Sequence, residues 1–174
     1  MTSHLSLDPK TAALLERTAT LVEAARSARM RLVYVVVSFR PGYPEVSPVH
    51  PTFAAVRESG RYIEGTPGTE VHPAVAPRPG EVVVTKHRVS AFAGTDLELI
   101  LRANGAETLI LAGIATSGVV PSTVRHAADA DYRLVVVEDC CADRDAEVHR
   151  VLTEKVFARQ TTVVKVGDVV AALS

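Results

Sequence analysis

The chain has 174 residues, enough for one domain with a buried core, and its 47% apolar and 22% charged residues are typical of a globular protein. The formal net charge is -1 and the charges are mixed along the chain, which excludes the basic face that a nucleic-acid partner requires. No apolar run approaches the roughly 20 residues that cross a bilayer, no signal-peptide pattern opens the chain, and the two cysteines are neighbours, so we expect a cytoplasmic protein with no membrane partner.

Short apolar, β-branched runs alternate with helical patterns along the chain. The runs predict strands buried on both faces, as in a parallel sheet, at residues 32–39, 81–85, 108–112, 134–138 and 161–166. Helices are predicted near residues 12–29, 95–104, 122–131 and 146–158. This order predicts an α/β fold, a three-layer α/β/α sandwich with a mostly parallel, doubly wound sheet, in a single domain spanning residues 1–174.

Capping residues support the predicted helix limits. Thr95-Asp96-Leu97-Glu98 has the pattern of a capping box, and Gly105 stands where a helix end favours a left-handed residue. Asp143 or Asp145 can cap the helix that follows the fourth strand.

Residues 40–80 are rich in proline and glycine and too long for a plain connection. Such a segment often carries a binding loop or lid, although an irregular surface excursion explains it equally well. Within it, the apolar stretch 46–56 is either a contact between subunits or a core-facing helix.

In an open parallel sheet, ligands bind beyond the carboxyl ends of the strands. Lys86 closes the second strand, where it either extends to solvent or stabilises an anion as a desolvated ammonium.

The turn at residues 113–123 begins a helix, and amide N–H groups there can bind an oxyanion or a carboxylate. An ordinary helix capped by Thr or Ser is the alternative interpretation of this turn. Val119 and Val120 stand where a P-loop requires Lys and Ser/Thr, so we expect no nucleotide and no other cofactor.

In this context the chain resembles the isochorismatase-like (cysteine hydrolase) family, which includes nicotinamidases, carbamoyl-amide hydrolases and isochorismatases. The resemblance is specific through the order and spacing of five segments: GTPGTE at 65–70, KHRVSAFAGTDL at 86–97, LAGIATS at 111–117, ST at 122–123 and DYRLVVVED at 131–139. It implies the isochorismatase-like hydrolase fold, a small-molecule substrate or ligand, and a homo-oligomer, either a dimer or a tetramer.

Family members that hydrolyse amides use an Asp from the first strand, a Lys after a middle strand and a nucleophilic Cys at a helix start. The resemblance implies that Lys86 is the family's lysine and that Val119 occupies the cysteine position, which makes the chain a divergent member lacking the catalytic cysteine. It also implies a cis peptide bond at Ala115–Thr116 and substrate-binding roles for Phe92, Ala115, Thr116, Ser117 and Gly118. The Asp-x-His-x-His metal pattern of nicotinamidases is absent, so we predict no metal.

The family's first strand is predicted to be shortened or missing. Residues 12–15 resemble half a strand joined directly to a helix, and Asp8 precedes this stub at the wrong end for the family Asp. Glu16 follows the stub as a weak substitute for that Asp, with an exposed helical Glu as the simpler interpretation.

Other nucleophiles have weaker support. Ser117 and Ser122 have no histidine placed by sequence to activate them, which favours helix capping. Cys140 and Cys141 are interpreted as a buried structural pair, with a reactive thiol as the alternative.

The sequence therefore predicts a hydrolase-family protein that acts on or binds a small polar metabolite (a carboxylate, amide or vinyl ether) without a cysteine nucleophile. Isochorismatases proper also lack this cysteine, so hydrolysis stays open. The alternative is a catalytically inactive pseudoenzyme serving as a ligand-binding or oligomeric interaction protein. Both hypotheses expect the Lys86 amine and the 113–119 turn to share one cavity.

Overall fold

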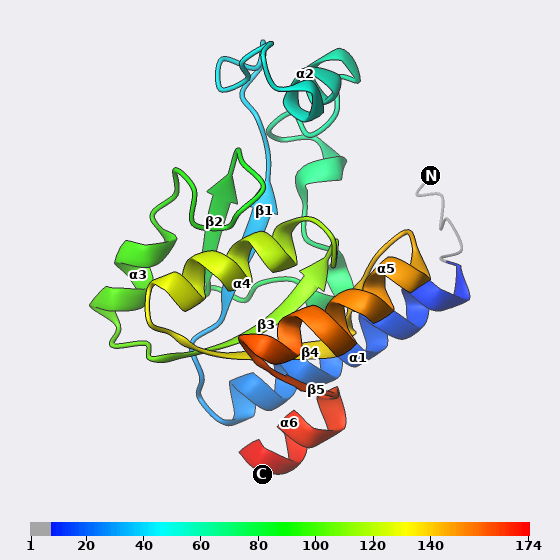
Figure 1. Ribbon diagram of the computed structural model, residues 1–174. Helices are drawn as coiled ribbons and strands as arrows, with labels where there is room; N and C mark the ends of the chain where they lie inside the picture. The colour runs from blue at the N-terminus through cyan, green and yellow to red at the C-terminus, as the bar shows by residue number, and fades with distance from the viewer. Residues whose placement is uncertain (1–7) are drawn as a thin grey trace. The chain divides into compact units, whose positions relative to one another are not determined.

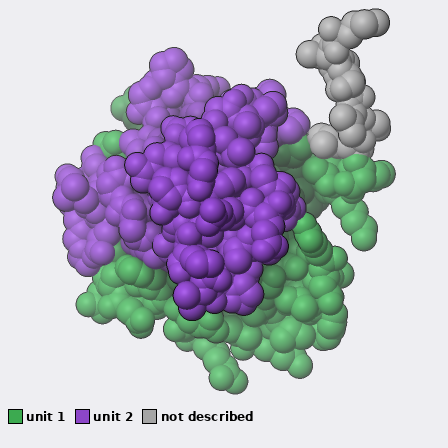
Figure 2. Space-filling view, turned by 90° about the horizontal axis from the view of Figure 1, so that it is seen from above, with its two compact units in different colours: residues 1–32, 106–174 green, residues 33–105 purple. Residues whose placement is uncertain are grey.

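The computed structural model describes residues 8–174, which separate into two compact units (Figure 2). Of the described residues, the first unit contains 8–32 together with 106–174, and the second contains 33–105. That the two units form one domain stays a prediction. Among the residues described, no helix has the length and apolar character needed to cross a membrane.

The first unit is built on a three-stranded parallel sheet in the order β3-β4-β5. The strands are β3 (Thr108–Ile114), β4 (Arg133–Ala142) and β5 (Thr162–Val164). The helices of this unit are α1 (Pro9–Ser27), α4 (Val119–Asp129), α5 (Ala146–Val151) and α6 (Val166–Leu173).

Helices cover both faces of this sheet, with α4 in front of it and α1 behind it in Figure 1. Leu21 of α1 and Val169 of α6 pack in one cluster with Val137 and Cys140 of β4. All four are at most 8% exposed, so burial of apolar surface holds these helices on the sheet.

The second unit contains a two-stranded parallel sheet and a separate small core. Its strands are β1 (Val33–Val37) and β2 (Val82–Lys86), and its helices are α2 (Pro51–Glu58) and α3 (Leu97–Ala103), with single 3-10 turns at Pro67–Thr69 and Pro73–Val75. The register pairs Val37 with Lys86, so the two strands end side by side. Beyond these ends, Phe39, Tyr43 and Val46 form a buried cluster.

The prediction of an α/β fold with parallel strands is confirmed, and each of the five strands overlaps its predicted run. Strand β4 continues to Ala142, past its predicted end at 138, and β5 is shorter than the predicted run 161–166. Helix α6, which follows β5 directly, was not predicted. Helix α2 lies inside the Pro/Gly-rich segment and overlaps residues 46–56, for which a helix was one of the two interpretations. The helix predicted at 146–158 is instead α5, a π-helical turn at Leu152–Val156 and a 3-10 turn at Phe157–Arg159. Apolar spacing does not distinguish these helical types.

The interpretation of residues 12–15 as half a strand is wrong, because they lie inside α1. Asp8 is the N-cap of this helix, and its Oδ1 accepts hydrogen bonds from the amides of Lys10 and Thr11 at 3.0 and 3.1 Å. Within residues 8–174 no strand precedes α1, and no ladder joins β1 or β2 to the other three strands. The predicted single sheet is therefore observed as two, and residues 1–7, where an earlier strand would fall, lie outside the described residues.

The capping box predicted at Thr95–Glu98 is also corrected. Helix α3 begins at Leu97, and its N-cap residue Asp96 makes no side-chain capping bond. Thr95 Oγ1 accepts the Leu97 amide at 3.3 Å instead. Gly105 has the expected left-handed conformation, with φ 63°.

Candidate functional site

The turn between β3 and α4 is the first part of the candidate site. Its cis peptide bond is Ile114–Ala115, so the position expected from the resemblance, Ala115–Thr116, is wrong by one residue. No local sequence signal locates a non-proline cis bond, which explains the error. Helix α4 begins at Val119, and Pro121 therefore falls in its first turn, where a missing N–H costs no helical hydrogen bond.

Most amide groups of this turn already have acceptors within the protein. Thr116 donates to the Ala142 carbonyl at 2.9 Å, Ser117 to Asp143 Oδ2 at 2.6 Å, and Gly118 to the Ala115 carbonyl at 3.1 Å. In the part of the chain that the structure describes, the N–H groups of Ala115 and Val119 have no such partner. Two backbone donors of the predicted set are thus left for an oxyanion or carboxylate.

The Asp143 carboxylate occupies the place at Ser117 where the sequence suggests a bound anion. Burial acts to raise the pKa of Asp143, but hydrogen bonds from the side chain and backbone of Ser117 outweigh it and lower the pKa below its usual value. The negative charge at this helix start is therefore supplied by the chain itself. The helix after β4 is capped by the other candidate, Asp145, whose Oδ1 accepts the amides of Glu147 and Val148.

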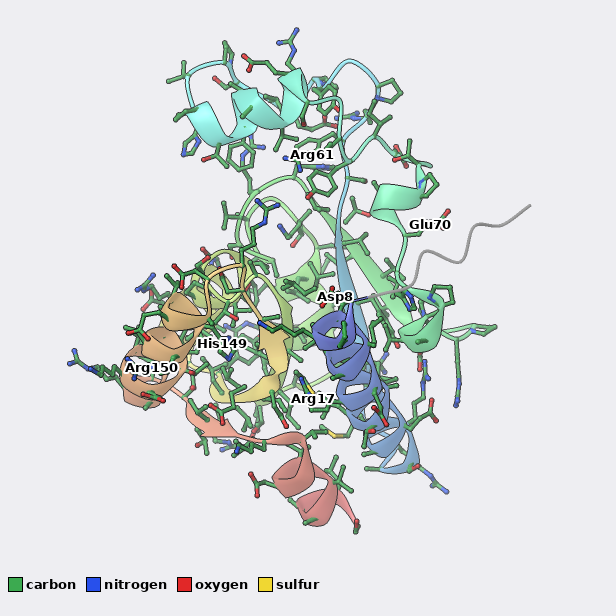
Figure 3. All side chains as sticks on the ribbon, turned by 90° about the vertical axis from the view of Figure 1, so that its right-hand side faces the viewer. Asp8, Arg17, Arg61, Glu70, His149 and Arg150 are labelled. Carbon is green, nitrogen blue, oxygen red and sulfur yellow. The ribbon has the colours of Figure 1, made fainter. Side chains whose placement is uncertain are left out.

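A histidine that the sequence did not single out also contacts the turn. His149 of α5 is labelled in Figure 3, and its Nδ1 lies 2.8 Å from Oγ1 of Thr116. Thr116 is wholly buried. The two residues are 33 positions apart, and only the capping of α5 by Asp145 offers a sequence signal for where this histidine faces.

His149 also borders a cleft of about 250 Å³ between α5 and β4 residues that precede the end of the strand. The other lining residues are Glu138, Asp139, Arg150, Thr153 and Glu154. Arg150 pairs with Glu147 and Glu154, and Asp139 Oδ1 accepts the Val166 amide, so several of these charges hold the fold together.

Neither serine candidate has the geometry of an activated nucleophile. Ser122 Oγ donates to the Gly118 carbonyl at 3.0 Å, one helical turn earlier. Ser117 interacts with Asp143, as described above. The capping interpretation is also wrong, because the N-cap of α4 is Gly118, which has no side-chain capping bond, and Ser122 bonds back to a carbonyl of its own helix instead.

Both thiols are buried, with Cys140 1% and Cys141 5% exposed. Burial raises the pKa of Cys140 to about 11 and that of Cys141 to about 12. At neutral pH both are protonated thiols rather than thiolates, which favours the interpretation as a structural pair.

Lys86 and Phe92 belong to the second unit. Lys86 ends β2, donates from Nζ to the Arg88 carbonyl at 2.8 Å, and has a pKa lowered by burial. Phe92 is 5% exposed and lies between β2 and α3 in the chain. Because Lys86 and the 114–119 turn belong to different units, a shared cavity stays a prediction.

Glu16 lies exposed within α1, well after its first turn, and its side chain makes no hydrogen bond or ion pair with another residue of 8–174. Within residues 8–174 no group of three or more His, Cys, Asp or Glu side chains is arranged to hold a metal ion.

Comparisons with known proteins identify relatives of this chain. The isochorismatase domain pattern matches residues 3–168. Maleamate amidohydrolase from Pseudomonas putida is 33% identical over 141 residues, covering 81% of this chain and 65% of that protein. A ureidoacrylate amidohydrolase from Methylorubrum extorquens is 35% identical, covering 74% and 57% respectively. The chain thus spans less than two thirds of the length of these two curated relatives.

Solved structures share the fold. An isochorismatase family protein from Burkholderia thailandensis superimposes with a TM-score of 0.80 at 31% identity, covering 93% of this chain and 83% of that one. A cysteine hydrolase from Pseudomonas syringae superimposes with a TM-score of 0.87 at 24% identity, a likeness of fold alone.

Proposed function

Because this chain belongs to the isochorismatase family, we propose that it binds a small polar metabolite and does not hydrolyse amides through a thioester. The observation that carries the proposal is Val119 as the first residue of α4, at the position that the family resemblance assigns to the nucleophilic cysteine. An isopropyl side chain has no atom that can attack a carbonyl.

The chemistry around Val119 supports binding without covalent catalysis. The free N–H groups of Ala115 and Val119 suit a carbonyl or carboxylate oxygen of the ligand. The two cysteines of the chain are buried and protonated, so neither replaces the missing thiolate.

The names of two relatives indicate a ligand class. Maleamate and ureidoacrylate each combine a carboxylate with an amide or ureido group. We propose that Lys86 contributes its positive charge to the binding of such a ligand. Its lowered pKa, caused by burial, supports this because a partly desolvated ammonium interacts more strongly with an anion.

The test measures binding and turnover separately. Isothermal titration calorimetry with maleamate, ureidoacrylate and isochorismate is expected to give saturable binding, while an ammonia assay and product chromatography detect no reaction. Ammonia release from maleamate by the wild-type chain would overturn the proposal. The absence of binding to every one of the three compounds would overturn it as well.

A variant probes the missing nucleophile directly. Val119→Cys introduces a thiol at the first residue of α4, and Val119→Ala is the matched control without sulfur. With the two N–H donors in place, the new thiol is expected to attack the amide carbon of maleamate, forming a thioester as the C–N bond breaks and ammonia leaves with the thiol proton. Intact-mass spectrometry should then detect this acyl adduct on Val119→Cys and none on Val119→Ala.

Hydrolysis without a thiol is the second candidate, and the lowered pKa of Lys86 favours it because such a lysine exchanges protons nearer neutral pH. Turnover of isochorismate that is lost in Lys86→Ala, with binding of the compound retained, would establish this function instead.

A further inference from the structure

Arg40 lies just beyond the carboxyl end of β1, the edge of the sheet where ligands of parallel sheets bind. Its side chain is 66% exposed, and its Nε donates to Glu45 Oε1 at 2.5 Å. Within the described residues Nη1 and Nη2 have no acceptor. One edge of the guanidinium is therefore fixed by Glu45, and the Glu64 carboxylate also stabilises its charge, while Nη1 and Nη2 keep their hydrogen-bond donors for a ligand.

Glu45 has an arrangement that ion pairing alone does not explain. Its side chain is only 8% exposed, and its Oε2 is buried with no hydrogen-bond partner among the described residues. Burial acts to raise the pKa of Glu45, but the hydrogen bond from Arg40 helps to lower it overall, so the carboxylate stays charged at neutral pH. A buried carboxylate with one oxygen unpaired adds little net stability, which points to a role in holding Arg40.

The neighbouring strand end fixes Glu45 in turn. Arg88, two residues after β2, donates from Nη2 to the Glu45 carbonyl at 3.0 Å and from Nη1 to the His87 carbonyl at 2.7 Å. Its guanidinium carbon also lies 5.2 Å from the centre of the Phe53 ring. Arg88 thus fixes the backbone of Glu45, and Glu45 fixes the side chain of Arg40.

We propose that Arg40 binds the carboxylate of the ligand through Nη1 and Nη2, with Glu45 as its positioning residue. Two parallel N–H donors match the two oxygens of a carboxylate, and a guanidinium already held by Nε loses less freedom on binding. Lys86 adds positive charge at the same edge, because β1 and β2 end side by side. The inference rests on the proposed function and narrows it to ligands that carry a carboxylate.

The test compares maleamate with maleic diamide, a neutral ligand of the same shape, by calorimetry. The wild-type chain is expected to prefer maleamate, and Arg40→Ala to weaken maleamate binding by about tenfold or more without weakening the diamide. Arg40→Lys keeps the charge but loses the paired donors, so it is expected to restore only part of the affinity. Arg57→Ala, which removes an exposed arginine of α2, is the control and is expected to bind as the wild type does.

Glu45→Gln tests the positioning role, because a general structural defect would weaken both ligands whereas loss of orientation weakens maleamate alone. Thermal unfolding checks that each variant is folded. If the Arg40 variants keep the wild-type preference for maleamate, the inference fails and the proposed function stands. If the wild-type chain binds neither maleamate nor the diamide, the inference fails; if it binds neither ureidoacrylate nor isochorismate as well, the proposed function fails with it.

Discussion

Oγ1 of Thr116 and Nδ1 of His149, 2.8 Å apart, join the turn before α4 to the helix after β4. The end of β4 and the residue after it supply two more contacts to the turn, from the Ala142 carbonyl and the Asp143 carboxylate. Together they fix which amides of the turn are occupied and which, at Ala115 and Val119, are free. The donor set of the candidate site is therefore a property of two segments, not of the turn alone.

Removing one partner of the Thr116–His149 pair should destabilise the protein. Thr116 is wholly buried, so His149→Ala leaves its hydroxyl without a partner at a cost of about 1–3 kcal/mol. Urea unfolding of His149→Ala, Thr116→Val and the double variant measures this cost, and the double variant should lose less than the sum of the two. Thr116→Ser keeps the hydroxyl and is the matched control. Strictly additive losses would show that the two side chains do not interact.

Asp143 should make stability depend on pH in the acidic range. Its folded pKa is lowered, so the ionised form contributes stability that is fully present above the unfolded pKa and is lost as pH falls through the folded pKa. Asp143→Asn is therefore expected to be less stable than the wild type at neutral pH, with the difference shrinking as pH falls. The difference between their urea midpoints at stepwise lower pH measures this.

Asp96→Asn serves as the control for Asp143, because Asp96 makes no side-chain bond to its helix. The difference between the urea midpoints of Asp96→Asn and the wild type should stay small across the same pH range. A difference for Asp143→Asn that does not change with pH would contradict the role assigned to its charge.

The sequence predicts the strands well because buried parallel strands are continuous apolar runs, as in the segment that forms β4. It does not predict which amides of the 114–119 turn are free, because Asp143 and His149 contact the turn from about 26 and 33 residues away. The Arg40–Glu45 pair was missed for a different reason. It lies in a Pro/Gly-rich stretch whose conformation no periodic pattern predicts, and the buried Oε2 of Glu45, which has no hydrogen-bond partner among the described residues, is visible only in the structure.

The native thiols should react very slowly. With the pKa of Cys140 near 11 and of Cys141 near 12, their thiolate fractions at mildly alkaline pH are at least about a hundredfold below that of a free cysteine. Ellman's reagent should therefore label neither thiol in the folded wild type and both in urea. Val119→Cys should gain one rapidly labelled thiol, because a helix N-terminus lowers the pKa of a thiol. Rapid labelling of the folded wild type would favour the reactive-thiol alternative.

Lys86 should contribute to binding at the expense of stability. Burial lowers its folded pKa, so the folded state binds its proton less tightly than the unfolded state; the resulting penalty is present at neutral pH and disappears as pH rises through the unfolded pKa. Lys86→Met removes the penalty and keeps an apolar side chain of similar length, so we expect a higher free energy of unfolding at neutral pH and a smaller gain at alkaline pH. Urea unfolding at both pH values measures this, with Lys155→Met, at an exposed position, as the control.

The Lys86→Met variant should also bind maleamate more weakly than the wild type does. A Lys86→Met chain that is less stable at neutral pH would show that the hydrogen bond from Nζ to the Arg88 carbonyl outweighs the cost of burying the charge.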